Sequence, residues 1–305
     1  MPAQTIYHAN GKLLLTGEYL VLHGAKAIAV PLKVGQQMTV SRIDNSQAIV
    51  WQARFQDKIW FECTINPDNF NIWGTSDPEK SDVLGQLFKA VQRLNPEFKP
   101  SAGMKFATTL ESDPEWGFGS SSTLVSLLAQ WAGTDPYRLN EMVFQGSGFD
   151  IACATANGPI FYIRNQPAIP VSLDYPFANQ LFLVYSGKKK GTAREVRSFL
   201  NEKLVSEQQV DEMSTLSEEI AKCDNQDDFN RLIQFHEEII GKLIEKTPVK
   251  KDFFPDFDGS IKSLGAWGGD FWLVSTAWPF LQVKKYFANK GFDPVFKWSD
   301  LILKK

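Results

Sequence analysis

A serine-rich loop with two glycines lies near the middle of the chain and could bind a phosphate group. Residues 115–123 read Glu-Trp-Gly-Phe-Gly-Ser-Ser-Ser-Thr, and an apolar helical run follows at once. Gly117 and Gly119 have no side chain, so backbone N–H groups can come close to a ligand. The serines stand where a helix begins, at N–H groups without helical partners and at the positive end of the dipole. We interpret residues 117–123 as a phosphate-binding loop; the alternative is a plain serine cap after a glycine turn.

A lysine and an aspartate in two other glycine motifs could take part in group transfer. Lys12 follows Gly11 beside a strand start and can reach a phosphate as a point charge, unless it is an ordinary surface lysine. Asp150 ends the run Gly-Ser-Gly-Phe-Asp at residues 146–150. Its carboxylate could accept a proton from a hydroxyl or help to hold Mg²⁺. The alternative role for Asp150 is to cap a turn or a helix.

A further glycine-rich run lies close to the C-terminal end of the sequence. Residues 265–270 read Gly-Ala-Trp-Gly-Gly-Asp and precede the apolar segment 271–274. Such a run leaves a loop with little side-chain bulk, suited to lying against another backbone or a phosphate chain, or simply to a tight turn into a strand. None of the motifs is a common P-loop, since no lysine follows the second glycine of the serine loop.

Strands are predicted to dominate the part of the chain before the serine loop. The strand-like segments are residues 13–15, 20–22, 27–30 (ended by Pro31), 38–40, 49–51, 59–61 and 104–110. A helix is expected over residues 82–94, where the apolar side chains keep to one face. A second helix is expected directly after the serine loop.

The later part of the chain changes in character. Strands are expected at residues 161–163, 181–185, 271–274 and 294–298, a helix-rich charged region at 194–246 and a further helix at 283–290. Because strands and helices are mixed in this order, the sequence predicts an α+β protein of two units, residues 1–170 and 171–305.

The composition narrows the range of partners. The 305 residues are 43% hydrophobic, enough for a sizeable core, and the formal net charge is −3, which argues against nucleic acid as the main partner. No apolar stretch reaches the roughly 20 residues needed to cross a bilayer, and the first residues lack the pattern of a secretory signal. We therefore expect a cytoplasmic protein without a membrane partner; a homodimer is one option for its assembly.

Cysteines and histidines give no sign of a metal centre. Cys63, Cys153 and Cys223 are far apart, without a CxxC pair, which fits a reducing compartment. The three histidines, at positions 8, 23 and 236, are also scattered and are interpreted as structural or exposed residues.

Taken together, the motifs resemble those of the GHMP kinase superfamily. The run Gly117-Phe-Gly-Ser-Ser-Ser-Thr is similar to the superfamily's GLGSSxx phosphate loop, and residues 265–270 are similar to its GAGGG loop. The opening Gly11-Lys12…Gly17-Glu18-Tyr19 resembles the GKxxxxGEYxVL start of phosphomevalonate kinases and the GEH form of mevalonate kinases. Residues 146–152 resemble the GSGxDxA segment of the mevalonate group.

This resemblance implies a fold and a set of residue roles. The expected fold has an N-terminal domain like ribosomal protein S5 domain 2 and a ferredoxin-like C-terminal domain. ATP phosphates would be held by Gly117, Phe118, Gly119, Ser120, Ser121 and Ser122, and Mg²⁺ by Ser121 or Ser122. Asp150 would orient or deprotonate the acceptor, and Lys12 would steady the transferring phosphoryl group. Acceptor contacts are expected from Glu18, Lys188, Lys189, Arg194, Gly265 and Gly268.

The resemblance also implies an activity, with three departures from the superfamily pattern. The expected protein is an ATP- and Mg²⁺-dependent kinase that phosphorylates a small-molecule alcohol or phosphate, either mevalonate or 5-phosphomevalonate, in isoprenoid precursor synthesis. Trp267 stands where the superfamily has glycine, and Leu264 where it has serine or threonine. The Mg²⁺-binding glutamate that mevalonate kinases place before the aspartate has no counterpart at that spacing, and Glu141 is the one glutamate nearby. The alternatives are therefore a kinase with a different acceptor and a non-catalytic homologue that binds a nucleotide or metabolite.

Overall fold

The computed structural model describes residues 4–44, 46–187, 199, 204–265, 267 and 269–304. These residues form two compact units that are interleaved along the chain. Unit 1 comprises Met1–Gly11, Val34–Pro114 and Phe118–Thr155, and unit 2 comprises Lys12–Lys33, Glu115–Gly117 and Ala156–Lys305. This division by compactness differs from a single cut at residue 170, and the division into functional domains stays a prediction.

A mixed β-sheet forms the frame of unit 1. Its strands pair in the order β5-β4-β3-β6-β2, with β1 beside β2, and β3 runs parallel to β6 while the other neighbours on this path are antiparallel. The strands are β1 (Thr5–Leu14), β2 (Ala27–Arg42), β3 (Ile49–Phe55), β4 (Lys58–Ile65), β5 (Ile72–Trp73) and β6 (Met104–Leu110). Both β1 and β2 continue into unit 2.

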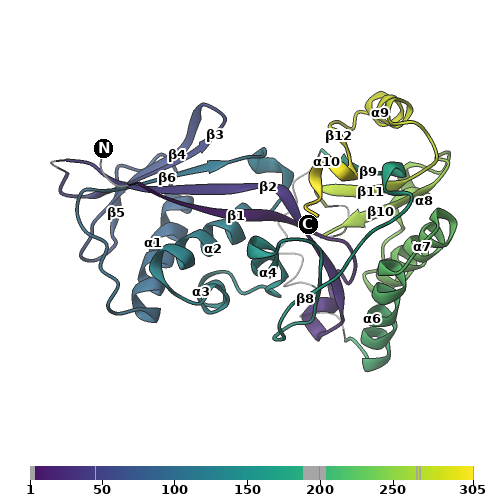
Figure 1. The fold of residues 1–305 in the computed structure, drawn as a ribbon, viewed down its shortest axis with the longest axis horizontal. Helices are drawn as coiled ribbons and strands as arrows, with labels where there is room; N and C mark the ends of the chain where they lie inside the picture. Colours follow the sequence, from purple (N-terminus) through teal and green to yellow (C-terminus); the bar gives the residue numbers. More distant parts are fainter. Residues whose placement is uncertain are drawn as a thin grey trace. The chain divides into compact units, whose positions relative to one another are not determined.

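Helices cover one face of this sheet (Figure 1). They are α1 (Pro78–Leu94), α2 (Ser120–Ala132), α3 (Pro136–Val143) and α4 (Phe149–Thr155). Asp77 and Asp135 cap α1 and α3 by accepting backbone N–H bonds, and a proline follows each cap at the first helical position. The aspartate–proline pairs therefore fix where these two helices begin.

Aromatic side chains fill the core of unit 1 between the sheet and its helices. Trp51 of β3 stacks on Phe106 of β6 with ring centroids 5.5 Å apart, and Phe88 of α1 meets both rings edge-on. Trp131 of α2 packs against Phe106 at 4.5 Å. Trp131 lies in the last turn of α2, the helix that follows the serine loop. The aromatic core therefore anchors this helix at its C-terminal end.

Unit 2 contains a four-stranded antiparallel sheet with a βαββαβ connection. Its strand order is β10-β11-β9-β12, which is the order 4-1-3-2 of a ferredoxin-like fold read from β12. The strands are β9 (Leu181–Tyr185), β10 (Ser260–Leu264), β11 (Phe271–Ser275) and β12 (Val295–Lys297). The first part of β2 belongs to unit 2 and pairs with β7 (Ile160–Tyr162), which pairs with β8 (Ile169–Pro170).

Helices pack against both faces of the four-stranded sheet. The helices of this unit are α6 (Glu207–Ala221), α7 (Gln226–Leu243), α8 (Val249–Phe253), α9 (Phe280–Asn289) and α10 (Trp298–Leu301), of which α6 packs on α7. The 3₁₀ turns of the chain are η1 (Leu20–His23), η2 (Pro114–Trp116) and η3 (Ala178–Gln180). Phe254, Phe287 and Trp272 form an aromatic core on the α8 and α9 side. On the opposite side, α7 reaches Ser260 and Ser275 through glutamine side chains.

The α+β class and the ferredoxin-like C-terminal arrangement are confirmed, and some local predictions were wrong. Residues 20–22 form part of the 3₁₀ turn η1 instead of a strand. Strand β2 does not end at Pro31, because the pairing passes to the C-terminal segment: Leu303 N–H donates to the Pro31 carbonyl and Leu32 bridges Ile302. The proline therefore lies where no ladder N–H is required of it. No helix of the described residues is long and apolar enough to cross a membrane.

Candidate active site

The start of α2 is an open helix N-terminus preceded by two left-handed glycines. Gly119 is the N-cap, with φ 93° and ψ 37°, and it makes no side-chain cap bond. Gly117 also has a positive φ of 66°. Thr123 N–H donates to the Gly119 carbonyl at 2.9 Å, closing the first helical turn. Within the described part of the chain, the N-cap of this 13-residue helix is a glycine without a side-chain cap bond, and free N–H groups at a helix start favour an anion.

The serine side chains of this loop have different environments. Ser122 is buried, and its hydroxyl donates to the Gly119 carbonyl at 2.8 Å. Ser121 is exposed and Ser120 is half-buried. Since the Ser122 proton is bonded within the helix, Ser121 is the more accessible oxygen of the two that were predicted to bind a metal.

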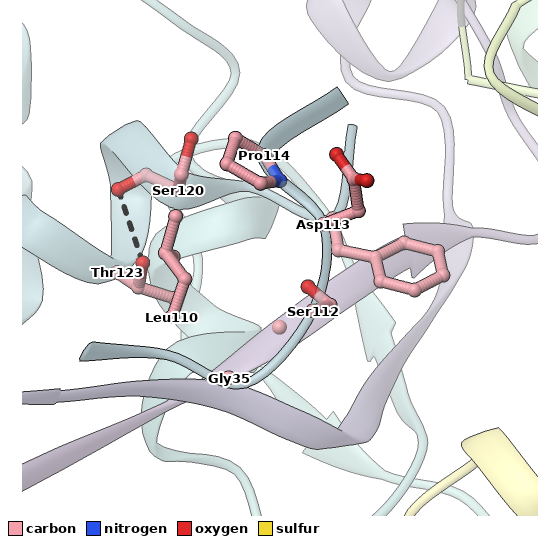
Figure 2. Close-up of a pocket in the computed structure, with 9 residues that line it drawn as sticks. Gly35, Leu110, Ser112, Asp113, Pro114, Ser120 and Thr123 are labelled. Atoms are coloured by element: carbon pink, nitrogen blue, oxygen red, sulfur yellow. Dashed lines mark hydrogen bonds between the residues drawn. The ribbon is translucent and has the colours of Figure 1, made fainter. Parts of the chain in front are cut away.

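A small hollow lies beside the first turn of α2 within unit 1 (Figure 2). Ser112, Asp113 and Ser120 bring polar groups to its lining, and the backbone of Gly35 forms part of its floor. The buried Phe118 also lines it, so this loop residue anchors the loop in the unit by packing. Thr123 Oγ1 lies 3.0 Å from the Ser120 carbonyl and 2.7 Å from Gln36 Oε1, which ties the helix start to β2.

The first glycine of the loop is held from two sides in unit 2. Lys12 Nζ donates to the Gly117 carbonyl at 3.0 Å. On the other side, a Cβ added to Gly117 would lie 1.7 Å from the Asp270 carboxylate, so no larger residue fits. The first, second and third glycine-rich motifs of the resemblance, represented by Lys12, Gly117 and Asp270, therefore meet at this point.

The two residues before Gly117 are docked on the four-stranded sheet. The hydroxyl of Tyr185 donates to the Glu115 carbonyl at 3.2 Å. Trp116 meets Phe296 of β12 edge-on, with ring centroids 5.1 Å apart. These contacts fix the entry to the serine loop in unit 2, and Trp116 is therefore a packing residue.

Asp150 is the second residue of α4 and is half-buried. Its Oδ1 accepts the N–H of Ile151 at 3.1 Å, and Gly148 before it has a φ of 91°. Asp150 belongs to unit 1 and Lys12 to unit 2. The joint action of these two residues on a phosphoryl group stays a prediction.

The third glycine motif accommodates its tryptophan by turning the indole inward. Trp267 is only 5% exposed, and its backbone N–H donates to the Tyr19 hydroxyl at 2.9 Å. The indole packs beside Gly241 of α7, where a Cβ would lie 3.5 Å from the ring, an ordinary van der Waals distance. Gly265 faces open space. The departure at Trp267 therefore changes the core of unit 2 while Gly265 keeps an uncrowded backbone.

Several predicted site residues cannot be placed. Lys188, Lys189, Arg194 and Gly268 lie outside the described residues. Within the described ranges, no group of three or more His, Cys, Asp or Glu side chains could hold a metal ion. A Mg²⁺ ion held by one hydroxyl or carboxylate together with nucleotide phosphates is the arrangement that this donor set would allow.

Glu18 is part of a buried cluster of charged residues in unit 2. The carboxylate, 3% exposed, pairs with Lys262 of β10, and its second oxygen lies 3.2 Å from Nε2 of His236 on α7. Burial alone would raise the pKa of Glu18, but the charge of Lys262 brings it below its usual value. Burial and the charge of Lys262 lower the pKa of His236 to about 4, so this imidazole is neutral at pH 7.

Glu237, next to His236 on α7, has the opposite behaviour. Its Oε1 accepts the N–H of Ser263 at 3.0 Å, and burial raises the pKa of Glu237 to about 8. Sequence reasoning missed Lys262, which lies between Ile261 and Ser263 in a short strand without a distinctive pattern, and it gave Asp270 no role. His236 is structural, as expected, because its ring is fully buried.

The raised pKa of Glu237 leads to a prediction about stability and pH. The ordinary value is 4.5, so between pH 4.5 and about 8 the unfolded chain loses this proton while the folded chain keeps it. We expect stability to fall as pH rises through this window, with a slope of up to about 1.4 kcal/mol per pH unit from this group. Glu237→Gln should remove that slope in denaturant unfolding at pH 5.5–8.5. Glu238→Gln, which alters an exposed neighbour paired with Lys251, should retain it; an unchanged slope in Glu237→Gln would show that Glu237 is ionised.

Comparison with known proteins identifies the fold. No model of a protein family and no curated sequence matches the chain. The mevalonate kinase of Methanococcus jannaschii matches with a TM-score of 0.73 and 18% identity, over 99% of each chain. Streptococcus pneumoniae phosphomevalonate kinase, in complex with phosphomevalonate and AMPPNP, matches with a TM-score of 0.70 and 14% identity, over 95% of this chain and 98% of that one. L. major mevalonate kinase in complex with R-mevalonate matches with a TM-score of 0.64 and 17% identity, over 100% and 96%.

These three structures are GHMP kinases, and the chain has the GHMP kinase fold. The fold expected from the glycine motifs is thereby confirmed over the whole chain. At 14–18% identity the likeness concerns the fold, and the same fold carries kinases that act on different acceptors.

Proposed function

We propose that the protein is an ATP-dependent phosphotransferase that acts on mevalonate or 5-phosphomevalonate. The observation that carries the proposal is the contact of Lys12 Nζ with the carbonyl of Gly117, the residue that begins the serine loop. This contact brings a cation to a glycine-rich loop that leads directly into the uncapped start of α2. Phosphoryl transfer needs this combination of backbone donors and fixed positive charge.

The loop fits the nucleotide that this reaction needs. Gly117 has no room for a side chain, and Gly119 adopts a left-handed conformation, so the backbone is presented without bulk. Residues 117–122 would hold the β- and γ-phosphates through backbone N–H groups, and Ser121, with Ser122 as a second donor, would bind Mg²⁺. The metal would neutralise charge on the phosphates when bound.

Asp150 and the lysine-rich segment would act on the acceptor. In this proposal the Asp150 carboxylate orients or deprotonates the attacking oxygen, and Lys12 steadies the transferring group. The matching structures include one with phosphomevalonate and one with R-mevalonate, which supports both acceptors equally. Gly265 and Gly268 would let the third loop approach the acceptor closely.

Lys188 and Lys189 provide a test of acceptor choice. Three adjacent lysines suit an acceptor that already carries a phosphate, so Lys188→Ala combined with Lys189→Ala should raise KM for 5-phosphomevalonate at least about tenfold more than KM for mevalonate. A matched pair on the exposed side of α9, Lys284→Ala with Lys285→Ala, should change neither value. Equal losses for both acceptors would contradict a phosphate-sensing role.

Coupled ADP production with Mg-ATP, mevalonate and 5-phosphomevalonate tests the proposal directly. Turnover with one acceptor supports the kinase and identifies the substrate. ATP binding without turnover on either acceptor would support the second candidate, a GHMP homologue that binds a nucleotide but has another acceptor or no activity. The observation behind this second candidate is Trp267 in the third loop. Failure to bind ATP would overturn the proposal.

A further inference from the structure

Four consecutive residues of the first glycine motif are each held by a different part of unit 2. The partners come from α6, α7, β10 and the third glycine loop. They are Thr16 with Ser217 (Oγ1 to Oγ, 2.7 Å), Gly17 N–H with His236 Nε2 (3.0 Å), Glu18 with Lys262, and Tyr19 with the Trp267 N–H (2.9 Å). Such a dense set of side-chain bonds on one short turn indicates that its position is strongly determined.

The backbone of this turn is in an unfavourable conformation. Gly17 has a φ of 82°, and a Cβ there would lie 2.8 Å from that of Ala27. Tyr19 has φ 63° and ψ −47°, which is rare for a bulky residue. Strain of this kind persists only where the surrounding structure enforces it, and it is concentrated at functional sites. Tyr19 is also enclosed by Phe199, whose ring centroid lies 4.9 Å away.

The ion pair of Glu18 and Lys262 explains how the turn is enforced. The two residues are 3% and 0% exposed, and Lys262 Nζ also donates to the Ser263 carbonyl at 2.7 Å. A buried ion pair adds little to stability compared with apolar residues of the same size, but it specifies one arrangement. The pair joins the turn to β10, the strand that leads into the third glycine loop.

The hydroxyl of Tyr19 then connects the turn to the middle of that loop. It accepts the N–H of Trp267, while the indole of the same residue is packed beside Gly241 on α7. The backbone and the side chain of Trp267 are therefore held separately. Without the hydroxyl, the backbone N–H of Trp267 would lose this buried acceptor, which weakens the link between the turn and the loop backbone.

We propose that Tyr19 is a positioning residue for the third glycine loop, and that Glu18 acts through Lys262 to hold Tyr19 in its strained conformation. This proposal rests on the proposed function, in which the third loop approaches the acceptor. It replaces the direct contact between Glu18 and the acceptor that the resemblance implies. In this proposal the first glycine motif, through Tyr19, positions the third glycine loop by its contact with Trp267, the residue that departs from the superfamily pattern.

Tyr19→Phe in the full-length protein tests this role, because the substitution removes one hydroxyl and keeps the ring. Selective ¹⁵N-tryptophan labelling gives the amide signal of Trp267, assigned by its loss in Trp267→Phe. We expect hydrogen exchange of this amide to be at least about tenfold faster in Tyr19→Phe. We also expect KM for the acceptor to rise about tenfold while kcat changes less than about threefold.

Tyr175→Phe is the matched control. Its hydroxyl is also buried and donates to a backbone carbonyl, that of Ile220 at 3.0 Å, away from the third loop. It should leave both the Trp267 amide and KM unchanged. The double variant Glu18→Gln with Lys262→Met, which removes both charges together, should accelerate exchange of the same amide as Tyr19→Phe does.

The outcomes separate this proposal from the proposed function. If the wild-type protein turns over neither acceptor, the proposed function fails, while the amide measurement still decides whether Tyr19 holds the loop. If Tyr19→Phe leaves the Trp267 amide and KM as in the wild type, the positioning role is wrong. Equal changes in Tyr19→Phe and Tyr175→Phe would also overturn it, since the effect would then be one of general stability.

Discussion

Asp150→Asn is expected to lower kcat by about 10²–10⁴-fold while the Kd for ATP changes less than about threefold. Asparagine has the same shape but cannot accept a proton, so in the proposed mechanism the acceptor would lose the carboxylate that orients or deprotonates it. The bond from the Ile151 N–H to the side-chain oxygen can persist, which keeps α4 intact. Single-turnover phosphoryl transfer together with calorimetric titration of ATP checks both parts of this result.

Asp227→Asn provides the control for a charge near a helix start. Asp227 is the second residue of α7, as Asp150 is of α4, and it is exposed. The two substitutions remove the same favourable interaction with a helix dipole, which is worth about 0.3–1 kcal/mol. Activity should be retained in Asp227→Asn. Comparable activity in both variants would remove Asp150 from the mechanism.

The second large effect is expected from Gly117→Ala. The new Cβ needs the space of the Asp270 carboxylate, 1.7 Å away, and the residue would also have to keep a φ of 66°. Either the Asp270 side chain or the loop must move, and a movement of the loop would displace the Gly117 carbonyl from Lys12. We expect the Kd for ATP to rise at least about tenfold and turnover to fall further, since 1.4 kcal/mol of lost interaction already gives a factor of ten.

Gly133→Ala separates the clash from the cost of the backbone conformation. Gly133 follows the other end of α2, has a φ of 62°, and has open space where a Cβ would lie. Both variants incur the left-handed penalty of about 1–2 kcal/mol, but only Gly117→Ala meets another residue. The midpoint temperature of thermal unfolding should be lower in both variants than in the wild type, whereas ATP affinity should be lower in Gly117→Ala alone. A similar loss of ATP affinity in both variants would mean that the contact with Asp270 is unimportant.

Elements with strong local signals could be predicted from the sequence. The helix expected at residues 82–94 and the strand at 104–110 correspond to α1 and β6. The apolar face of the helix and the position of the strand before the glycine–serine loop are both visible in the local sequence. The start of α1 at Pro78 was missed, although Asp77 and Pro78 are an ordinary start signal. Residues 20–22 were read as a strand from their apolar character, but the left-handed Tyr19 turns the chain into a 3₁₀ helix there.

The candidate site was predictable only where its residues are close in sequence. The glycine–serine loop and its helix form one continuous segment, so their relation follows from helix geometry. The pairing of Glu18 with Lys262 joins residues 244 positions apart, and no local pattern contains it. The inward orientation of Trp267 likewise places the indole beside Gly241 of α7 and its backbone N–H on a hydroxyl from the first motif, partners that are distant in sequence.

The interleaving of the two units has a consequence for biosynthesis. All residues of unit 1 lie within the first 155, so this unit can be completed while the ribosome is still translating the rest. The segment Lys12–Lys33 belongs to unit 2, and its partners Ser217, Glu218, His236, Lys262 and Ile302 emerge last. The segment that begins at Lys12 is synthesised early, but its contacts with the rest of unit 2 form late, because contacts across such long loops form slowly. A nascent chain can therefore fold unit 1 well before the contact between Lys12 and the Gly117 carbonyl has its supporting structure.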